Sequence, residues 1–162
     1  MPKILSLLLV TLLAAQTALA DDAALQAAIA GKHRTDVYVE RDRYRNPLQT
    51  LKLFDVQSQH TVVEIWPGGG WYTEILAPYL RERGKLIAAH YDENDKQADY
   101  RPGLRQRFEK KLAGNPAVYD KVQVSSLMFD EATGKLVLPA ARDGSVDRVV
   151  TFRNAHGLVS RG

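Results

Sequence analysis

The sequence predicts an α/β fold with a Rossmann-like open, mainly parallel sheet, and three observations support this prediction. Short β-branched, apolar segments alternate along the chain with longer segments of helical periodicity. One apolar segment runs directly into three glycines, Gly68–Gly70, and a helical pattern follows at once. No internal repeat interrupts the alternation after the N-terminal region. Alternation of this kind is typical of parallel sheets with right-handed crossovers.

The first twenty residues have the pattern of a secretory signal peptide. Lys3 supplies a positive charge, Ile4–Leu13 is apolar, and Ala18–Ala20 matches the small-residue pattern of a cleavage site. The apolar run is too short for a permanent membrane anchor. We therefore expect cleavage after Ala20, a periplasmic or secreted location and no stable membrane anchor. An uncleaved anchor is the alternative.

After the signal peptide, residues 1–20, we expect an N-terminal helical and irregular region over residues 21–45 and one α/β domain over residues 46–162. Ala23–Ala30 is alanine-rich and predicts a helix that ends at Gly31. Lys32–Arg45 is polar and predicts irregular structure.

The α/β domain is expected to begin with a helix, because Asn46-Pro47 reads as an N-cap followed by a first-turn proline. The predicted strands are Thr61–Trp66, Leu86–His90, Lys121–Ser125 and Arg148–Phe152, with an extra strand or loop arm at Gly134–Leu138, and the predicted helices are Trp71–Arg83 and Arg101–Leu112. The chain ends directly after the last strand, so we expect a sheet that is incomplete at the C-terminus.

Composition excludes several kinds of site and partner. The chain has no cysteine, which excludes disulfides and thiolate metal sites, and its four histidines show no paired spacing for a metal ion. The net charge of +3 is too small to indicate a nucleic-acid partner. Arg41, Arg43 and Arg45 alternate with Asp42 and follow Glu40, so we expect their charges to be partly neutralised.

The glycine turn limits the ligands that the domain could bind. Such a turn lets the backbone approach a ligand at the carboxyl ends of the strands. A phosphate-binding P-loop is excluded because no lysine follows Gly70. A dinucleotide fingerprint would need glycine at position 73, where Thr73 stands. The nucleoside of S-adenosylmethionine is the third ligand class that uses such a turn, and a tight turn without a ligand is the alternative.

The string VVEIWPGGGWYTEILA resembles motif I of the class I S-adenosylmethionine-dependent methyltransferases. Glu64 matches the acid of that motif, Gly68 and Gly70 match its second and third glycines, and Thr73 matches its threonine. Trp66 replaces the first glycine and is a departure from the motif. The chain is also similar, over most of its length after the signal peptide, to a group of predicted exported bacterial methyltransferases.

The resemblance implies S-adenosylmethionine as the cofactor and methyl transfer to an acceptor, expected to be a small molecule, as the reaction. It implies that Glu64 accepts a hydrogen bond from the cofactor's ammonium, directly or through water. For Glu64 alone, capping of the following helix is the alternative. Gly68, Gly69 and Gly70 would admit the ribose and methionine portion. The aromatic residues Trp66, Trp71 and Tyr72 would form a wall near the sulfonium, or would pack the loop against the preceding helix through Leu51 and Phe54.

Ribose and acceptor contacts are expected at two further strand ends. In the family, an acid after the second strand pairs with the ribose hydroxyls. His90 occupies that position here, so Asp92, two residues on, is the first candidate and His90 the second, with an ordinary loop carboxylate as the alternative for Asp92. After the last strand, Asn154 and His156 are the candidate catalytic residues, and His156 is a general base or a surface histidine.

The acceptor atom stays open, because NAHG at residues 154–157 does not match the [DN]-P-P-[YF] motif of amino-directed methyltransferases. Two other functional classes also stay open. One is a non-catalytic exported binding or interaction domain with the same fold, and the other is a nucleotide-dependent oxidoreductase, which Thr73 disfavours. An incomplete sheet would also allow an inactive chain. The sequence indicates no oligomeric state.

Overall fold

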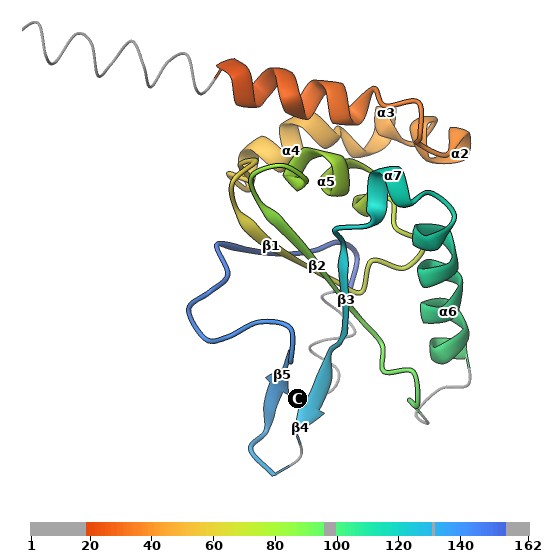
Figure 1. Cartoon of the computed structure of the whole chain (residues 1–162), viewed down its shortest axis with the longest axis vertical. Coiled ribbons are helices and arrows are strands. Elements are labelled where there is room, and N and C mark those ends of the chain that lie inside the picture. Colours follow the sequence, from red (N-terminus) through yellow and green to blue (C-terminus); the bar gives the residue numbers. More distant parts are fainter. Residues whose placement is uncertain (1–18, 96–99, 131, 155–162) are drawn as a thin grey trace, which may run out of the picture.

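The computed structural model describes residues 19–95, 100–130 and 132–154, which form an α/β fold. Four parallel strands make the main sheet in the order β3–β2–β1–β6 (Figure 1). Their bounds are Thr61–Ile65 for β1, Lys85–His90 for β2, Gln123–Ser126 for β3 and Arg148–Thr151 for β6. The predicted fold class is confirmed, and all four predicted core strands are present.

β1 lies inside the sheet because it pairs with β2 on one side and with β6 on the other. Glu64 lies opposite Ala88 of β2 and Val150 of β6. Neighbouring side chains of a strand point to opposite faces, so Val62 and Glu64 share one face while Val63 lies on the other. Both valines are buried, which confirms that this strand is covered on both faces.

One face of the sheet is covered by helices, and the main core lies between them and the strands (Figure 1). Leu51, Ile75 and Leu76 are fully buried there, and each such side chain contributes roughly 1.5–3 kcal/mol by leaving water. The helices span residues 19–29 and then α2 Asp36–Val39, α3 Asp42–Arg45, α4 Pro47–Leu53, α5 Thr73–Leu80, α6 Tyr100–Ala113 and α7 Pro116–Tyr119.

The other face is covered by the segment that joins β3 to β6, which contains no helix among its described residues. Val63, Ile87 and Ala89 form a second, smaller core on this face. The partners that this segment supplies to the smaller core are Leu127, Leu138, Ala140, Ala141 and Val146.

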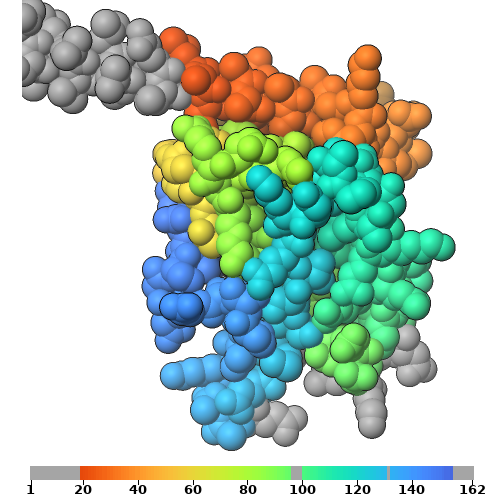
Figure 2. Space-filling view, viewed as in Figure 1, coloured from red at the N-terminus to blue at the C-terminus, as the bar shows by residue number. Residues whose placement is uncertain are grey.

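A two-stranded antiparallel hairpin, β4 Met128–Asp130 with β5 Lys135–Val137, projects from the body at the lower edge of Figures 1 and 2. Phe129 and Leu136 are half exposed on it. The predicted extra strand at Gly134–Leu138 is confirmed. Its partner β4 was not predicted, because a strand of three residues is too short to show an alternating pattern.

The prediction of irregular structure for Lys32–Arg45 is wrong, because this segment forms the short helices α2 and α3. Each helix carries an acid in its first turn, Asp36 and Asp42 respectively, and α3 also has Arg43 and Arg45 in its last turn. Charges in these places suit the helix dipole, so the signal was present in the sequence. We call residues 32–45 the lead-in segment.

The predicted signal peptide lies almost wholly outside the described residues. Its last two residues, Leu19 and Ala20, are helical, and the helix continues to residue 29. Among the described residues, no helix has the length and apolarity needed to cross a membrane.

Asp21 joins this N-terminal helix to the body of the domain. Its carboxylate accepts hydrogen bonds from the Ser58 amide at 3.2 Å, from the Ser58 hydroxyl and from the Tyr79 hydroxyl. Arg83 approaches the same carboxylate, with Nη2 at 3.1 Å. One acid therefore satisfies donors from the loop before β1 and from the end of α5.

Asp21→Ala is expected to lower the free energy of unfolding by about 1–3 kcal/mol, because partly buried donors lose their acceptor. The neighbouring Asp22→Ala is a matched control. Asp22 pairs with Lys52, and since the two side chains are 41% and 51% exposed, its loss should cost less than about 1 kcal/mol. Urea unfolding followed by circular dichroism measures both, and equal losses would contradict an anchoring role for Asp21.

Candidate functional site

The carboxyl ends of β1 and β6 meet where the strand order reverses. From β1 the chain winds through β2 to β3, and β6 then pairs on the other side of β1. Open α/β sheets bind ligands in the crevice at such a point. A cavity of about 250 Å³ lies here, between the lead-in segment, the loop of residues 66–72, and Phe152–Asn154 after β6. We call residues 66–72 the glycine loop and this cavity the switch-point pocket.

A larger cavity of about 470 Å³ lies near the N-terminal ends of β1 and β2, beside Gln57 and Arg83. Its charged lining residues Asp21, Lys52 and Arg83 are already engaged in ion pairs within the protein. Because it lies at the wrong end of a parallel sheet for ligand binding, we do not take it as the functional site.

The glycine loop uses left-handed backbone conformations at three positions. The φ angles are 47° at Trp66, 61° at Gly68 and 82° at Gly70. Only glycine adopts this region without steric cost. Trp66 therefore occupies a backbone region that favours glycine, at a cost of roughly 1–2 kcal/mol. Its ring stacks on Tyr91, with centroids 5.3 Å apart and planes 25° apart.

The three glycines are needed for different reasons. A Cβ at Gly69 would lie 2.2 Å from the Tyr38 hydroxyl, and a Cβ at Gly70 would lie 3.0 Å from the Phe108 ring. A Cβ at Gly68 would meet no atom within 4 Å. Packing thus explains Gly69 and Gly70 without a ligand, and only Gly68, which lines the switch-point pocket, faces open space.

Glu64 is buried beside the pocket, with 2% of its surface exposed. Its Oε2 accepts a hydrogen bond of 2.6 Å from the Thr73 hydroxyl. Burial raises the pKa of Glu64 to about 7, although the Thr73 hydrogen bond and the Lys111 charge oppose that rise. Glu64 thus contacts the start of α5 through a side chain and not through a capped backbone amide, and it titrates near neutral pH.

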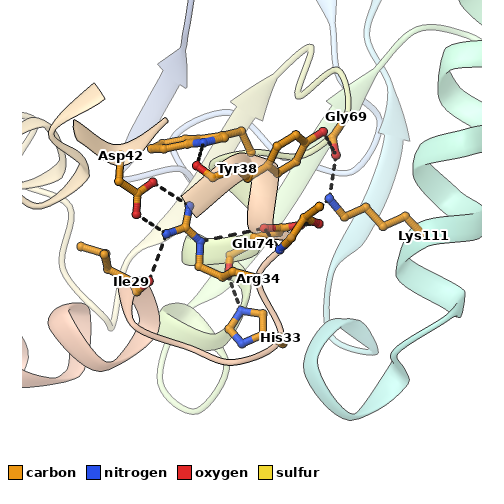
Figure 3. Close-up of polar contacts among 10 residues, drawn as sticks. Ile29, His33, Arg34, Tyr38, Asp42, Gly69, Glu74 and Lys111 are labelled. Carbon is orange, nitrogen blue, oxygen red and sulfur yellow. Dashed lines mark hydrogen bonds and ion pairs between the residues drawn. The ribbon is translucent and has the colours of Figure 1, made fainter. Parts of the chain in front are cut away.

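The start of α5 is tied to the lead-in segment by a buried ion network around Glu74 (Figure 3). The Glu74 carboxylate accepts hydrogen bonds from the Thr35 amide at 3.0 Å and from the Thr35 hydroxyl at 2.6 Å. Lys111 Nζ of α6 lies 2.6 Å from Glu74 Oε1, and Arg34 Nε lies 3.9 Å from Oε2. Arg34 also pairs with Asp42, its Nη2 donating to Oδ1 at 3.0 Å.

Two of these segments also hold the glycine loop itself (Figure 3). The Gly69 carbonyl accepts hydrogen bonds from the Tyr38 hydroxyl at 3.1 Å and from Lys111 Nζ at 2.9 Å. The Trp71 indole in turn donates to the Tyr38 carbonyl at 2.8 Å. The lead-in segment and α6 therefore fix the loop, and we call Arg34, Thr35, Tyr38, Glu74 and Lys111 the clamp.

The aromatic residues around the loop divide between the two predicted roles. Trp71 and Tyr72 are buried, and the Tyr72 ring stacks on Phe152 with centroids 3.5 Å apart. Both pack within the core and against the lead-in segment and the end of β6, although each also borders the pocket. Trp66 is half-buried and lines the pocket too, so it is the most exposed of the three.

The ribose candidates lie outside the switch-point pocket. His90 is fully buried, its Nδ1 accepts a 2.8 Å hydrogen bond from the Tyr91 amide, and its ring packs on Phe108. Burial lowers the pKa of His90 to about 4, so the ring is neutral at neutral pH. Asp92 is half-buried and accepts a 2.8 Å hydrogen bond from the Asn94 amide. Solvent reaches Asp92 and not His90.

Asn154 is the candidate catalytic residue that the structure describes, and His156 lies outside the described residues. Asn154 lines the pocket, and its Nδ2 donates to the Ile65 and Trp66 carbonyls, each at 3.2 Å. Its amide therefore ties the exit of β6 to the glycine loop. Among residues 19–95, 100–130 and 132–154, no cluster of side chains suited to hold a metal ion is found.

The lead-in segment lines the pocket with Tyr38, Arg41 and Arg45, which were not predicted as part of the site. The sequence shows the charges of Arg41 and Arg45, but it does not show that α2 and α3 fold back over the glycine loop. The expected neutralisation by Asp42 is also wrong, because Asp42 pairs with the buried Arg34. Adjacent residues of a helix point in different directions, which is why alternation along the chain does not pair them.

No protein-family model matches the chain, and a search of curated proteins found no match. Among solved structures, the chain is similar to the crystal structure of cofactor-bound Rv0187 from MTB, with 18% sequence identity and a TM-score of 0.47. The similarity covers 90% of this chain and 57% of that protein, so the chain spans little more than half of its length.

Proposed function

We propose that the switch-point pocket binds S-adenosylmethionine and that the protein transfers the cofactor's methyl group to an acceptor. The observation that carries the proposal is the position of the pocket. It lies where the strand order reverses, and it is lined by a glycine loop whose one unobstructed glycine, Gly68, borders it.

The residues of the pocket fit this cofactor. Glu64 is the one carboxylate among the lining residues, and it would accept a hydrogen bond from the cofactor's ammonium group. Gly68 leaves room beside the backbone, and Trp66 and Phe152 would bring aromatic rings near the cofactor's sulfonium. Asp92 would contact the ribose from the end of the neighbouring strand β2.

S-adenosylmethionine supplies a methyl group on a sulfonium: the acceptor's electron pair forms the new bond to carbon while the carbon–sulfur pair leaves with sulfur. The protein's residues would bind the cofactor and the acceptor and orient them for such an in-line displacement. Positioning of this kind supplies much of the rate. The clamp keeps the glycine loop in place, and Asn154 holds the β6 exit against it. A general base is not obligatory for such a displacement.

Calorimetric titration of the purified protein with S-adenosylmethionine tests the proposal. We expect saturable binding with one site per chain. NAD is the comparison ligand, because binding of NAD would support a nucleotide-dependent oxidoreductase. A folded protein that binds neither would support an exported, non-catalytic binding domain. We also propose cleavage after Ala20 and a periplasmic or secreted location, which the mass of the exported protein tests.

Affinity for S-adenosylmethionine is expected to fall as the pH falls below 7. The ammonium needs ionised Glu64, whose pKa is about 7, so protonation competes with binding. Between pH 7 and pH 5.5 the ionised fraction of a group with a pKa of about 7 falls from about one half to about 3%, so we expect a loss of affinity of roughly 15-fold. Glu64→Gln removes the titrating group while keeping a partner for Thr73, and calorimetry should find its affinity nearly independent of pH. The same pH dependence in both proteins would contradict the role of Glu64.

A further inference from the structure

Three arginines surround the switch-point pocket: Arg41 and Arg45 of the lead-in segment and Arg153 after β6. None of their guanidinium groups makes an ion pair with a carboxylate of the described residues. Asp42, the nearest acid in sequence to Arg41, is taken by Arg34, with Nη1 at 2.5 Å from Oδ2. The positive charge at the pocket is therefore not balanced from within this part of the chain.

Arg45 is the best defined of the three. It is half-buried, and its guanidinium lies over the Trp71 ring, 4.7 Å from the centroid. Burial lowers the pKa of Arg45, and the charges of Arg41 and Arg153 lower it further. Arg45 is thus close enough to be repelled by both Arg41 and Arg153, and the indole holds it in place against that repulsion.

The charge of the proposed cofactor does not relieve this excess. S-adenosylmethionine carries a sulfonium and an ammonium against one carboxylate, so it brings a net positive charge. Glu64 is the one lining carboxylate, and at neutral pH it is only partly ionised because its pKa is about 7. A second ligand with negative charge would complete the balance. Guanidinium groups suit carboxylates and phosphates because their planar donors bind two oxygens at once.

We propose that Arg41, Arg45 and Arg153 form a subsite for an anionic group, a carboxylate or phosphate, of the methyl acceptor. The inference rests on the proposed methyl transfer and narrows its substrate class to anionic molecules. Arg45, fixed on Trp71, would supply the oriented contact, and the exposed Arg41 and Arg153 would close around the anion from the two sides of the pocket.

Titration of the full-length protein with inorganic phosphate, and separately with acetate, tests the subsite. Each titration is made at constant ionic strength, with and without saturating S-adenosylmethionine, and is followed by calorimetry. Arg45→Gln should weaken anion binding by roughly tenfold or more, as expected for a lost hydrogen bond to a charged group. Arg43→Gln is the matched control, because Arg43 belongs to the same helix α3, lies over Tyr44 and does not line the pocket. Circular dichroism of both variants verifies the fold.

The outcomes separate the possible sources of the anion. Phosphate or acetate binding that persists with the cofactor bound, and that Arg45→Gln but not Arg43→Gln weakens, supports an acceptor subsite. A different result would overturn the acceptor subsite and assign the arginines to the cofactor's own carboxylate. In that case the anion competes with S-adenosylmethionine, and Arg45→Gln weakens binding of S-adenosylmethionine. The same variant then leaves binding of methylthioadenosine, which lacks the carboxylate, unchanged. Equal effects of the two variants overturn the subsite. Arginine-dependent anion binding by a protein that binds no S-adenosylmethionine overturns the proposed function and supports the anion subsite alone.

Discussion

Replacing Glu74 with alanine is expected to lower the free energy of unfolding by about 3–5 kcal/mol, as is typical when one partner of a buried ion pair is removed. The Glu74 side chain is 1% exposed and lies between Arg34, which is fully buried, and Lys111, which is 26% exposed. The substitution would also leave the Thr35 amide and hydroxyl without their acceptor. Since a domain of this size is stable by only about 5–15 kcal/mol, this is a large effect.

Glu109→Ala is the matched control for this measurement. Glu109 also pairs with a cation, Arg105, at 2.8 Å, but its side chain is 43% exposed and the pair spans one helical turn. Its loss should cost less than about 1 kcal/mol. Urea unfolding of the two variants gives the comparison. A loss in Glu74→Ala as small as that expected for Glu109→Ala would mean that burial adds nothing to the Glu74 network, and that the clamp does not stabilise the domain.

The parts of the fold that the sequence predicted are those with a clear periodic pattern. Thr61–Trp66 is apolar and β-branched throughout, which is typical of a strand covered on both faces, and β1 is such a strand. The helices α2, α3 and α7 and the strand β4 have only three or four residues each, so they show no period. Their formation depends mainly on tertiary contacts, and the charges at the ends of α2 and α3 were the local signal that the sequence offered.

The candidate site divides in the same way. The glycine loop could be found because its residues are consecutive, whereas the opposite wall of the pocket could not. Tyr38 contacts Gly69 across 31 residues of sequence, and Thr35 contacts Glu74 across 39. Only the structure shows why glycine is needed at each of these positions, because the atom that a Cβ at Gly69 would meet is the Tyr38 hydroxyl. A charge pattern along the chain was misleading for the same reason, since Asp42 binds an arginine eight residues earlier.

Gly68→Val is expected to weaken S-adenosylmethionine binding by about 100-fold, the loss typical when extra methylene groups are forced into a fitted site. The valine side chain would project into the space beside the loop, where no protein atom lies within 4 Å of the new Cβ. If the cofactor occupies that space, the valine side chain and S-adenosylmethionine must compete for it. The measurement is calorimetric titration of the variant with S-adenosylmethionine.

Gly134→Val separates this effect from backbone strain. Gly134 has a φ of 66°, close to the 61° of Gly68, and a Cβ there also meets no atom within 4 Å, but it lies in the turn between β4 and β5 and away from the pocket. Valine is strained at both positions, so both variants should lose similar stability. Only Gly68→Val should then lose affinity. Unchanged affinity in both would remove Gly68 from the cofactor site, and equal loss in both would attribute the effect to strain in the chain instead of to the pocket.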